Sequence, residues 1–299
     1  MKPAPFEYQA PASLEAALAA LARHGGDAKL LAGGQSLIPV MNFRLAQPAL
    51  LIDINKLTEL DFVRRGEDGS LRIGALVRQR RLEREPLVAE AAPLLRDAVP
   101  FIAHPQIRNR GTFGGSLAHA DPAAELPAVA VALRARFRLQ KAGGERWVEA
   151  SDFFAGLFTT SLEPDELLVE AAIPALAPRT GWAFLEVARR HGDYAQAGVA
   201  ALVTLGEDGR CREARLVYLS VGDAPVEARE AARLLIGELL VGGTTAAPAV
   251  EAAAEKASRD EMDPFGDIHA TSDFKRHLAR VLTRRALFQA AGRASQGRL

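Results

Sequence analysis

The sequence is poor in cysteine, since Cys211 is the only one among its 299 residues. A disulfide bond within the chain is therefore impossible, which is typical of proteins from a reducing compartment. An iron–sulfur cluster normally needs about four thiolate ligands, and cysteine-rich zinc sites also need several. The single cysteine excludes both kinds of site within this chain.

The sequence also lacks an excess of charge, since 37 Lys and Arg residues balance 37 Asp and Glu residues. Nucleic-acid-binding surfaces normally carry a basic excess, so we expect no nucleic-acid partner. Long apolar runs are missing: the run 126–133 is too short to cross a bilayer, and the first residues lack the apolar stretch of a signal peptide. We predict a cytoplasmic protein without a membrane span.

Several well-known site motifs are missing as well. The sequence contains no G-x-G-x-x-G, no G-x-x-x-x-G-K-[ST], no H-E-x-x-H and no G-x-S-x-G. These absences exclude a plain Rossmann dinucleotide site, a P-loop, a zincin site and a nucleophile elbow. The six histidines show no metal-ligand spacing, so we expect no metal site.

The length of the chain predicts two domains. The first elements predicted along the sequence form a small α/β unit. Apolar residues at helical spacing predict a helix at 13–24, with Ser13 as its N-cap. Strands are predicted at 29–32 and 49–54, and the unit ends near residue 57.

A second predicted unit reaches residue 173. Its elements are a hairpin of 61–65 and 71–74, a helix at 86–99, a long loop at 103–121, a helix at 122–133, a hairpin of 135–140 and 145–149, a short helix at 151–155 and a strand at 166–173.

Pro174 and Pro178 mark a domain boundary after this unit. Beyond it, an α+β arrangement is indicated because the strands come first and the helices follow. The strands are predicted at 183–189, 199–205 and 212–220, the helices at 225–240, 246–258 and 272–291, and a frayed polar tail from residue 292.

Two glycine-rich segments stand out, at 31–37 (LAGGQSL) and 108–116 (RNRGTFGGS). Glycine lets the backbone approach an anion closely and adopt positive φ, so that successive N–H groups point at phosphate oxygens. Ser36, Thr112 and Ser116 add hydroxyl donors. One such segment is also common in ordinary turns, but two within one domain-sized stretch favour a ligand with a diphosphate group.

Carboxylates and other polar side chains near the second segment leave alternatives open. Asp121 is either the N-cap of the next helix, with Pro122 at the first position, or, like Glu125, an acceptor for ribose hydroxyls of a nucleotide. Arg108 and Arg110 either pair with phosphate or are solvated. Tyr194 either stacks on a ring of the ligand or belongs to the core, which is its commoner position.

At these residues the sequence resembles a known family. Residues 32–39 (AGGQSLIP), 44–48 (RLAQP) and 51–54 (LIDI) resemble the N-terminal FAD-binding segment of the xanthine dehydrogenase and carbon monoxide dehydrogenase medium subunits. Residues 104–117 (HPQIRNRGTFGGSL), continued to Glu125, resemble the second motif of this family, and 189–195 (RRHGDYA) the entry of its C-terminal domain. The resemblance covers nearly the whole chain and is the main reason to expect FAD.

The resemblance implies an α+β fold. A PCMH-type, vanillyl-alcohol-oxidase-like FAD-binding domain would span 1–176, with α/β subdomains at about 1–57 and 58–176. A CO-dehydrogenase flavoprotein-like α+β domain would span 177–290, and 291–299 would form a tail.

The resemblance also implies a site that holds FAD non-covalently, since no histidine or cysteine matches a covalent attachment point. The pyrophosphate would lie on a first loop, and a second group of residues would continue this cradle. Asp121 or Glu125 would reach the adenosine end of FAD. A third group of residues would lie near the ring system. The first loop is Ala32, Gly33, Gly34, Gln35, Ser36 and Leu37; the second group is Thr112, Gly115 and Ser116; the third is Ile102, Ile107, Leu168 and Tyr194.

One departure from the family pattern concerns Glu186, near which related chains commonly have a lysine. An acidic side chain facing the ring would stabilise negative charge on it less well, so the role of that lysine is not transferred to Glu186. Gln35 and Ser116 also stand where other members have different polar residues.

In this family the substrate is hydroxylated at a molybdopterin centre in a large subunit, and electrons pass through [2Fe–2S] clusters of a small subunit to FAD in the medium subunit. The resemblance therefore implies an electron-transferring oxidoreductase subunit of a heterotrimer or its dimer, with no residue catalysing hydroxylation. The acceptor stays open among NAD, oxygen, a quinone and other carriers. Two alternatives remain: a stand-alone FAD-dependent oxidoreductase of similar fold, and a scaffold subunit that has lost flavin.

Overall fold

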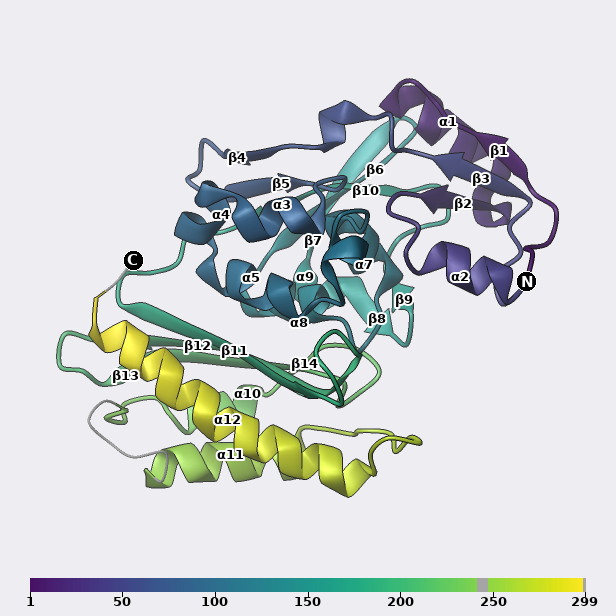
Figure 1. Cartoon of the computed structure of the whole chain (residues 1–299). Helices are drawn as coiled ribbons and strands as arrows, with labels where there is room; N and C mark the ends of the chain where they lie inside the picture. Colours follow the sequence, from purple (N-terminus) through teal and green to yellow (C-terminus); the bar gives the residue numbers. More distant parts are fainter. Residues whose placement is uncertain (241–246, 298–299) are drawn as a thin grey trace.

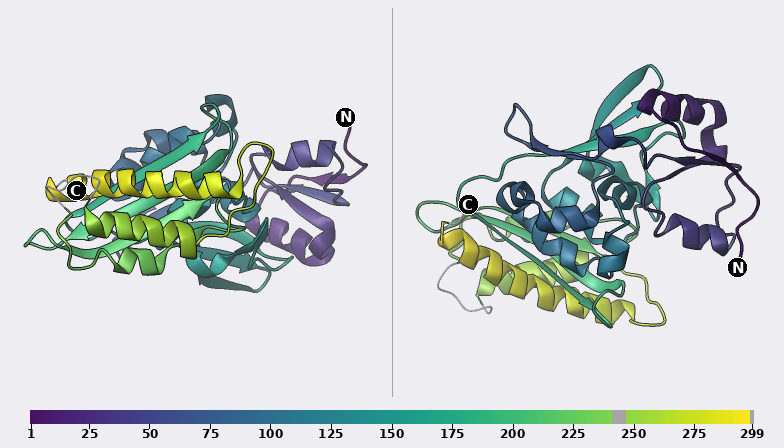
Figure 2. Two further views of the ribbon diagram at one scale, coloured as in Figure 1. Left: turned by 90° about the horizontal axis from the view of Figure 1, so that it is seen from below. Right: turned by 45° about the horizontal axis from the view of Figure 1, so that its top comes forward.

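The computed structural model describes residues 1–240 and 247–297, in which three main sheets follow one another along the chain (Figure 1). The N-terminal unit lies at the end of the molecule opposite the C-terminus, as both views of Figure 2 show. No helix in the described part of the chain is long and apolar enough to cross a membrane.

The N-terminal unit is a parallel three-stranded sheet of order β1-β3-β2 with an amphipathic helix packed on it. The predicted cap is confirmed, because the Ser13 hydroxyl accepts a hydrogen bond from the Ala16 amide at 3.2 Å. Leu18 and Leu21 of the helix share a buried cluster with Ile52. The elements are β1 (Glu7–Gln9), α1 (Leu14–His24), β2 (Ala28–Leu31), α2 (Leu37–Asn42) and β3 (Leu50–Asp53).

The middle unit is a five-stranded antiparallel sheet of order β4-β5-β10-β6-β7. Its strands are β4 (Val63–Arg65), β5 (Leu71–Gly74), β6 (Arg136–Lys141), β7 (Gly144–Glu149) and β10 (Leu167–Ile173). A small hairpin of β8 (Phe154–Gly156) and β9 (Thr159–Thr160) follows the short helix α9 (Ala150–Phe153). Both predicted hairpins of this unit are confirmed.

Several predictions for the helices of this unit are wrong. The helix expected at 86–99 is broken at Ala92, just before Pro93, a residue type that removes a backbone donor and interrupts a helix. The expected loop 103–121 contains two short helices, and one further helix was not predicted. The helices are α3 (Gln79–Arg84), α4 (Pro86–Ala91), α5 (Pro93–Ala98), α6 (Pro105–Arg108) and α7 (Phe113–His119).

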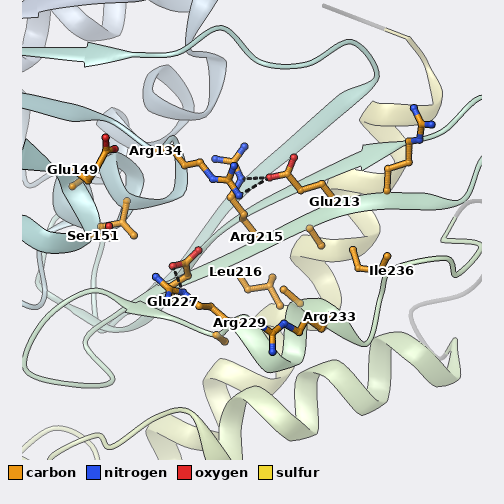
Figure 3. Close-up of a pocket in the computed structure, with 16 residues that line it drawn as sticks. Arg134, Glu149, Ser151, Glu213, Arg215, Leu216, Glu227, Arg229, Arg233 and Ile236 are labelled. Atoms are coloured by element: carbon orange, nitrogen blue, oxygen red, sulfur yellow. Dashed lines mark hydrogen bonds and ion pairs between the residues drawn. The ribbon is translucent and has the colours of Figure 1, made fainter.

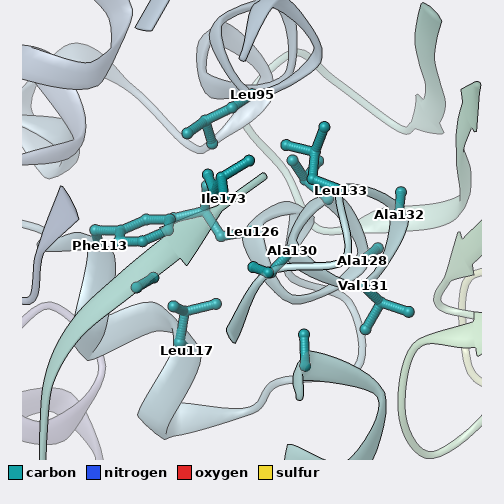
Figure 4. Packing of buried hydrophobic residues seen from close by; sticks show 14 of the residues in the cluster. Leu95, Phe113, Leu117, Leu126, Ala128, Ala130, Val131, Ala132, Leu133 and Ile173 are labelled. Atoms are coloured by element: carbon teal, nitrogen blue, oxygen red, sulfur yellow. The ribbon is translucent and has the colours of Figure 1, made fainter. Parts of the chain in front are cut away.

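The helix expected at 122–133 begins later, as α8 (Glu125–Ala132). Asp121 is therefore not its N-cap; the Asp121 carboxylate accepts a hydrogen bond from the Ala123 amide at 2.9 Å and forms a turn before the helix. Every residue of α8 is buried, as is typical of a helix that is apolar all round. Figure 4 shows Leu126 of α8 together with Phe113 and Ile173 in the main core of the middle unit.

The third sheet has the order β11-β12-β13-β14 and is antiparallel. One face packs on α5 and α8 of the middle unit, and the other is covered by two long helices, as Figures 1 and 2 show. The strands are β11 (Thr180–Ala188), β12 (Ala195–Leu205), β13 (Cys211–Leu219) and β14 (Val226–Glu227); the helices are α10 (Arg229–Arg233), α11 (Pro248–Asp260) and α12 (Ser272–Ser295).

In the third unit the strands come before the helices, which confirms the predicted α+β pattern. Two details of the prediction for this unit are wrong. The helix expected at 225–240 is only α10, preceded by β14. The tail expected to fray from residue 292 continues α12 to Ser295, because Arg293 donates hydrogen bonds to Asp97 and to the Trp182 carbonyl. The expected helix start at residue 246 and the last two tail residues lie outside the described residues.

Candidate functional site

The first glycine-rich loop connects β2 to α2. Gly34 has φ +72°, a left-handed conformation that favours glycine. Among the described residues, no hydrogen bond is donated by the backbone N–H groups of residues 33–36, and the segment is half-buried. Buried or half-buried N–H groups normally have a partner. This loop therefore offers successive amides to an acceptor, as the sequence predicts.

The second glycine-rich loop forms the first turn of α7 and behaves differently. The Thr112 hydroxyl caps this helix by accepting from the Gly115 amide at 3.1 Å. The amides of residues 113, 114 and 116 donate to the carbonyls of Val77, Ala75 and Thr112. The prediction that successive amides of both loops point at phosphate is thus wrong for the second loop, since its amides are used within the protein. The Ser116 hydroxyl, half-buried, has no hydrogen bond among those described.

The two loops lie against each other. A Cβ atom on Gly33 would be 2.5 Å from the Arg110 carbonyl oxygen and 2.8 Å from the Gly111 Cα atom. A Cβ atom on Gly115 would be 3.8 Å from the Ala32 Cβ atom. The structure therefore brings together residues 32–36 and 110–116, which are about 80 positions apart in the sequence, and the close approach requires glycine at residue 33.

Two residues that the sequence did not single out hold this contact. The Arg78 guanidinium donates to the Arg110 carbonyl at 2.5 Å and to the Asn55 side-chain oxygen at 2.6 Å. The Asn55 amide group donates in turn to the Ala32 carbonyl at 2.8 Å. Asn55 directly follows the LIDI motif, which was a usable signal; nothing in the sequence pointed to Arg78.

A second group of predicted residues gathers around the start of α8. Burial raises the pKa of Glu125 to about 7, with a further rise from Asp121 and an opposing effect of Arg108. Desolvation of the phenol, together with the charges of Asp121 and Glu125, raises the pKa of Tyr194. Tyr194 is 72% exposed, so it is not a core aromatic. The charges of Asp121 and Glu125 of the middle unit thus act on Tyr194, which lies in the loop before β12.

Glu186 belongs to the same group. Burial, and then the charge of Glu125, raise its pKa to about 8. The neighbouring loop is tightly packed: Gly192 has φ +87°, and a Cβ atom there would be 2.6 Å from the His104 ring. This contact joins the third unit to the segment just before α6.

Burial decides the role of Arg108 but not that of Arg110. Arg108 is 4% exposed and donates to the Ile102 carbonyl at 2.8 Å and to Glu83 at 3.3 Å, so it is a structural residue. Arg110 is exposed, which fits a phosphate contact as well as solvation. Desolvation raises the pKa of Asp53, but hydrogen bonds with Tyr8 and Asn55 and the positive charge of Arg110 lower it overall.

The apolar residues expected near the ring differ in their solvent exposure. Ile102 (8% exposed) and Leu168 (4%) belong to the same buried core cluster, whereas Ile107 is half-buried. Leu168 sits in the middle of the five-stranded sheet, paired with Leu139. Ile107 thus has more surface available to a ligand than the other two.

A separate cavity of ≈ 390 Å³ lies between the far end of α8 and the third sheet (Figure 3). Its arginines are largely neutralised: Arg134 and Arg215 contact Glu213 at 2.9 and 3.2 Å, and Arg229 contacts Glu227 at 2.7 Å. None of the predicted site residues lines this cavity. The described residues also contain no group of three His, Cys, Asp or Glu side chains placed to hold a metal ion.

Comparison with protein families gives two matches that together span most of the chain. Residues 4–176 match the FAD binding domain in molybdopterin dehydrogenase, and residues 182–290 match the CO dehydrogenase flavoprotein C-terminal domain.

Individual relatives agree with these matches. The chain is 42% identical to the 6-hydroxypseudooxynicotine dehydrogenase complex subunit alpha of Paenarthrobacter nicotinovorans, over 98% of this chain and 97% of that one. It is 40% identical to the carbon monoxide dehydrogenase medium chain of Hydrogenophaga pseudoflava, over 99% of this chain and 100% of that one.

Solved structures extend the likeness to the fold. A structure of carbon monoxide dehydrogenase from Hydrogenophaga pseudoflava matches with a TM-score of 0.93 and 40% identity, over 98% of this chain and 99% of that one. Quinoline 2-oxidoreductase from Pseudomonas putida 86 matches with a TM-score of 0.92 and 38% identity, over 98% and 99% of the two chains. The predicted family and α+β fold are confirmed: the chain belongs to the FAD-binding medium subunits of the molybdenum hydroxylase family of oxidoreductases.

Proposed function

We propose that this chain holds FAD non-covalently between its two glycine-rich loops and relays electrons from [2Fe–2S] clusters of a partner subunit to an external acceptor. The observation that carries the proposal is the contact of loop 32–37 with loop 110–116. Within the part of the chain that the structure describes, four successive N–H groups of the first loop have no protein partner. A diphosphate accepts hydrogen bonds from such amides. The residues present therefore fit the cofactor that the family binds.

In this proposal each loop has its own task. Loop 32–37 binds the pyrophosphate through backbone amides. Thr112 orders the first turn of α7, Gly115 leaves room beside Ala32, and Ser116 adds a hydroxyl group. The second loop thus acts by shape and by its side chains rather than by its amides.

The grouping of Tyr194 with Asp121 and Glu125 refines the expected orientation. If Tyr194 covers the ring system, the two carboxyl groups lie toward that end of FAD rather than at the adenosine end. Half-buried Ile107 then contributes apolar surface, while Ile102 and Leu168 support it from the core.

FAD supplies the ability to exchange electrons one or two at a time; the protein supplies position, charge and exclusion of water. The single cysteine places any iron–sulfur cluster in another chain. We therefore propose a heterotrimer or its dimer in the cytoplasm, with a molybdopterin-binding large subunit and a [2Fe–2S] small subunit, and no nucleic acid. The relatives named above as a "complex subunit alpha" and a "medium chain" support this assembly.

We also propose a domain boundary between 1–176 and the segment that begins at 177, with subdomains at about 1–57 and 58–176; the tail expected at 291–299 belongs to α12 as far as Ser295. The three main sheets, the change of sheet between β10 and β11, and the two family matches support it.

The visible absorption spectrum of the purified chain tests the cofactor. We expect flavin absorption bands that stay with the folded protein on gel filtration. We expect FAD to separate from the protein when the protein is denatured. In Gly115→Val we expect loss of FAD with the fold retained, because a Cβ atom there would be 2.6 Å from the Thr112 hydroxyl oxygen. Gly144→Val, where a Cβ atom meets nothing within 4 Å, is the matched control. A colourless protein that gains no colour with added FAD would refute the proposal and support a scaffold role.

Copurification tests the relay. We expect two partner chains, with iron and molybdenum in the complex. A chain that purifies alone, holds FAD and oxidises or reduces a small molecule by itself would instead support the stand-alone oxidoreductase.

A further inference from the structure

Glu186 lies on the face of β11 that packs against the middle unit. Phe184 and Trp182, two and four positions earlier, pack in or against the core of that unit, and side chains of a strand alternate between faces. Phe184 contacts the Phe101 ring, with centroids 5.3 Å apart. Glu186 thus places a carboxyl group on the same face of β11 as two aromatic side chains.

The neighbouring strand is shaped around this side chain. Gly198 of β12 pairs directly with Glu186, and a Cβ atom on Gly198 would be 3.0 Å from the Glu186 Cβ atom and 2.5 Å from Leu219 Cδ2. Any larger residue at 198 would displace one of the two. The strand beside Glu186 is thus occupied by uncharged residues at this register.

The middle unit brings a second carboxyl group, that of Glu125, to the same end of the sheet. The Ser220 amide, directly after β13, donates to the Pro122 carbonyl at 2.8 Å, and Pro122 lies three positions before Glu125. Glu125 is 8% exposed at the first turn of α8, which packs on β12 and β13. Asp121 and Arg108 act on the charge of Glu125, and Glu125 in turn acts on Glu186 and on Tyr194. Of these only Arg108 is cationic, and it is already bound to Glu83 and to three carbonyl oxygens.

The Glu186 carboxyl group is short of hydrogen-bond donors. Among the described residues, Glu186 Oε2 is buried without a hydrogen-bond partner. A buried carboxylate without donors is costly, and two carboxylates close together do not both stay ionised. Burial, followed by the charge of Asp121 for Glu125 and the charge of Glu125 for Glu186, raises the pKa values to about 7 for Glu125 and about 8 for Glu186. Because the two groups interact, these values describe the pair rather than either residue alone.

We propose that Glu125 and Glu186 form a carboxyl pair that holds one proton at the junction of the two domains, beside the flavin, and whose protonation follows the number of electrons on the flavin. The inference rests on the proposed function, because Tyr194 and Asp121, which lie in the same group, are proposed to contact FAD.

The coupling is electrostatic. Electrons arriving from the partner's iron–sulfur clusters add negative charge beside the pair, which favours the protonated form of a carboxyl group. A proton then moves from water to a carboxylate oxygen, forming one O–H bond. When the external acceptor removes the electrons, that O–H bond breaks and the proton returns to water. The pair thus limits the build-up of negative charge in a site that has little cationic compensation.

The midpoint potential of FAD in the assembled complex, measured against pH, tests this coupling. The wild type is compared with Glu186→Gln and Glu125→Gln, which keep the side-chain size and remove the titration. One extra proton per two electrons adds about 30 mV per pH unit to the slope. We expect up to this extra slope in the wild type around pH 7–8 and its loss in both variants. Glu90→Gln, whose side chain is 69% exposed, is the matched control and keeps the wild-type profile.

Infrared spectroscopy of the FAD-free chain gives a separate measurement. We expect the carbonyl band of a protonated carboxyl group to persist at neutral pH, to titrate at pH 7–8 and to weaken in either variant. The inference would be overturned if both variants gave the same dependence of potential on pH as the wild type. It would also be overturned if the carbonyl band of the protonated carboxyl group were absent at neutral pH. Failure of the wild-type chain to bind FAD would instead overturn the proposed function, and the infrared titration would still show whether the pair holds a proton.

Discussion

The Arg110 carbonyl oxygen lies directly over Gly33, so close that a Cβ atom at residue 33 would be only 2.5 Å from it. Carbon atoms of real side chains do not approach a backbone oxygen to this distance, and a backbone atom cannot rotate away. The glycine of the first loop therefore serves a contact between two loops as well as an approach to phosphate.

We predict that Gly33→Ala forces the loops apart and lowers FAD affinity at least about tenfold, which corresponds to about 1.4 kcal/mol. Fluorescence titration of the apoprotein with FAD measures this change. Gly26→Ala is the control, since a Cβ atom there meets nothing within 4 Å. Equal FAD affinity in Gly33→Ala and wild type would show that the loop contact does not shape the site.

The bridge made by Arg78 gives a second prediction. Lysine has no planar fork and cannot donate to the Arg110 carbonyl and to Asn55 together in the same geometry. In Arg78→Lys we expect a stability loss of about 1 kcal/mol and weaker FAD binding, although Arg78 itself need not touch the cofactor. Arg84→Lys, at an exposed position of the same helix, serves as the control. An unchanged unfolding midpoint and FAD affinity in Arg78→Lys would argue against a bridging role.

The sequence predicted the sheets of this fold better than its short helices. The strands of the middle and third units carry alternating or fully apolar patterns, and Gly69 and Gly143, both with positive φ, mark the hairpin turns. The helices α6 and α7 have four and seven residues and are glycine- or proline-rich. Local propensity does not specify such helices; contacts of α7 with β5 and β10 do.

The site was predictable in its motifs and not in its connections. Glycine and hydroxyl residues identified both loops, but only the fold shows that the amides of the second loop are already satisfied. The Glu125–Glu186 pair joins residues 61 positions apart, on elements of different units, and no local pattern encodes it. Arg108 was ambiguous for the same reason, since burial decides its role.

A third prediction concerns Asp97 of α5, which links the middle unit to the C-terminal helix. Its carboxylate accepts from the Trp182 indole at 2.9 Å and from Arg293 at 3.0 Å, and the Arg293 guanidinium lies 5.0 Å from the Trp182 ring centroid. Asp97→Ala leaves both donors without their acceptor, so we expect a loss of about 1–3 kcal/mol in unfolding free energy. Asp263→Ala, whose side chain is 94% exposed, is the control. Equal denaturation midpoints for Asp97→Ala and wild type would show that this link adds no stability.

The fourth prediction follows from the raised pKa of Glu186, which is about 8 in the folded chain against 4.5 for an ordinary glutamate side chain. Because the folded state binds the proton more tightly, the stabilisation is complete below pH 4.5 and is lost as the pH rises through about 8. Glu186→Gln removes this dependence. We expect the variant to match the wild type in acid and to be more stable at alkaline pH, by on the order of a few kcal/mol.

Denaturant unfolding of the two proteins as a function of pH measures this difference. Glu90→Gln, at an exposed position, should follow the wild type throughout. The sign of the effect is the decisive result. If Glu186 were instead held ionised by an unseen positive partner, Glu186→Gln would lose stability at alkaline pH, because the folded state would then favour the carboxylate.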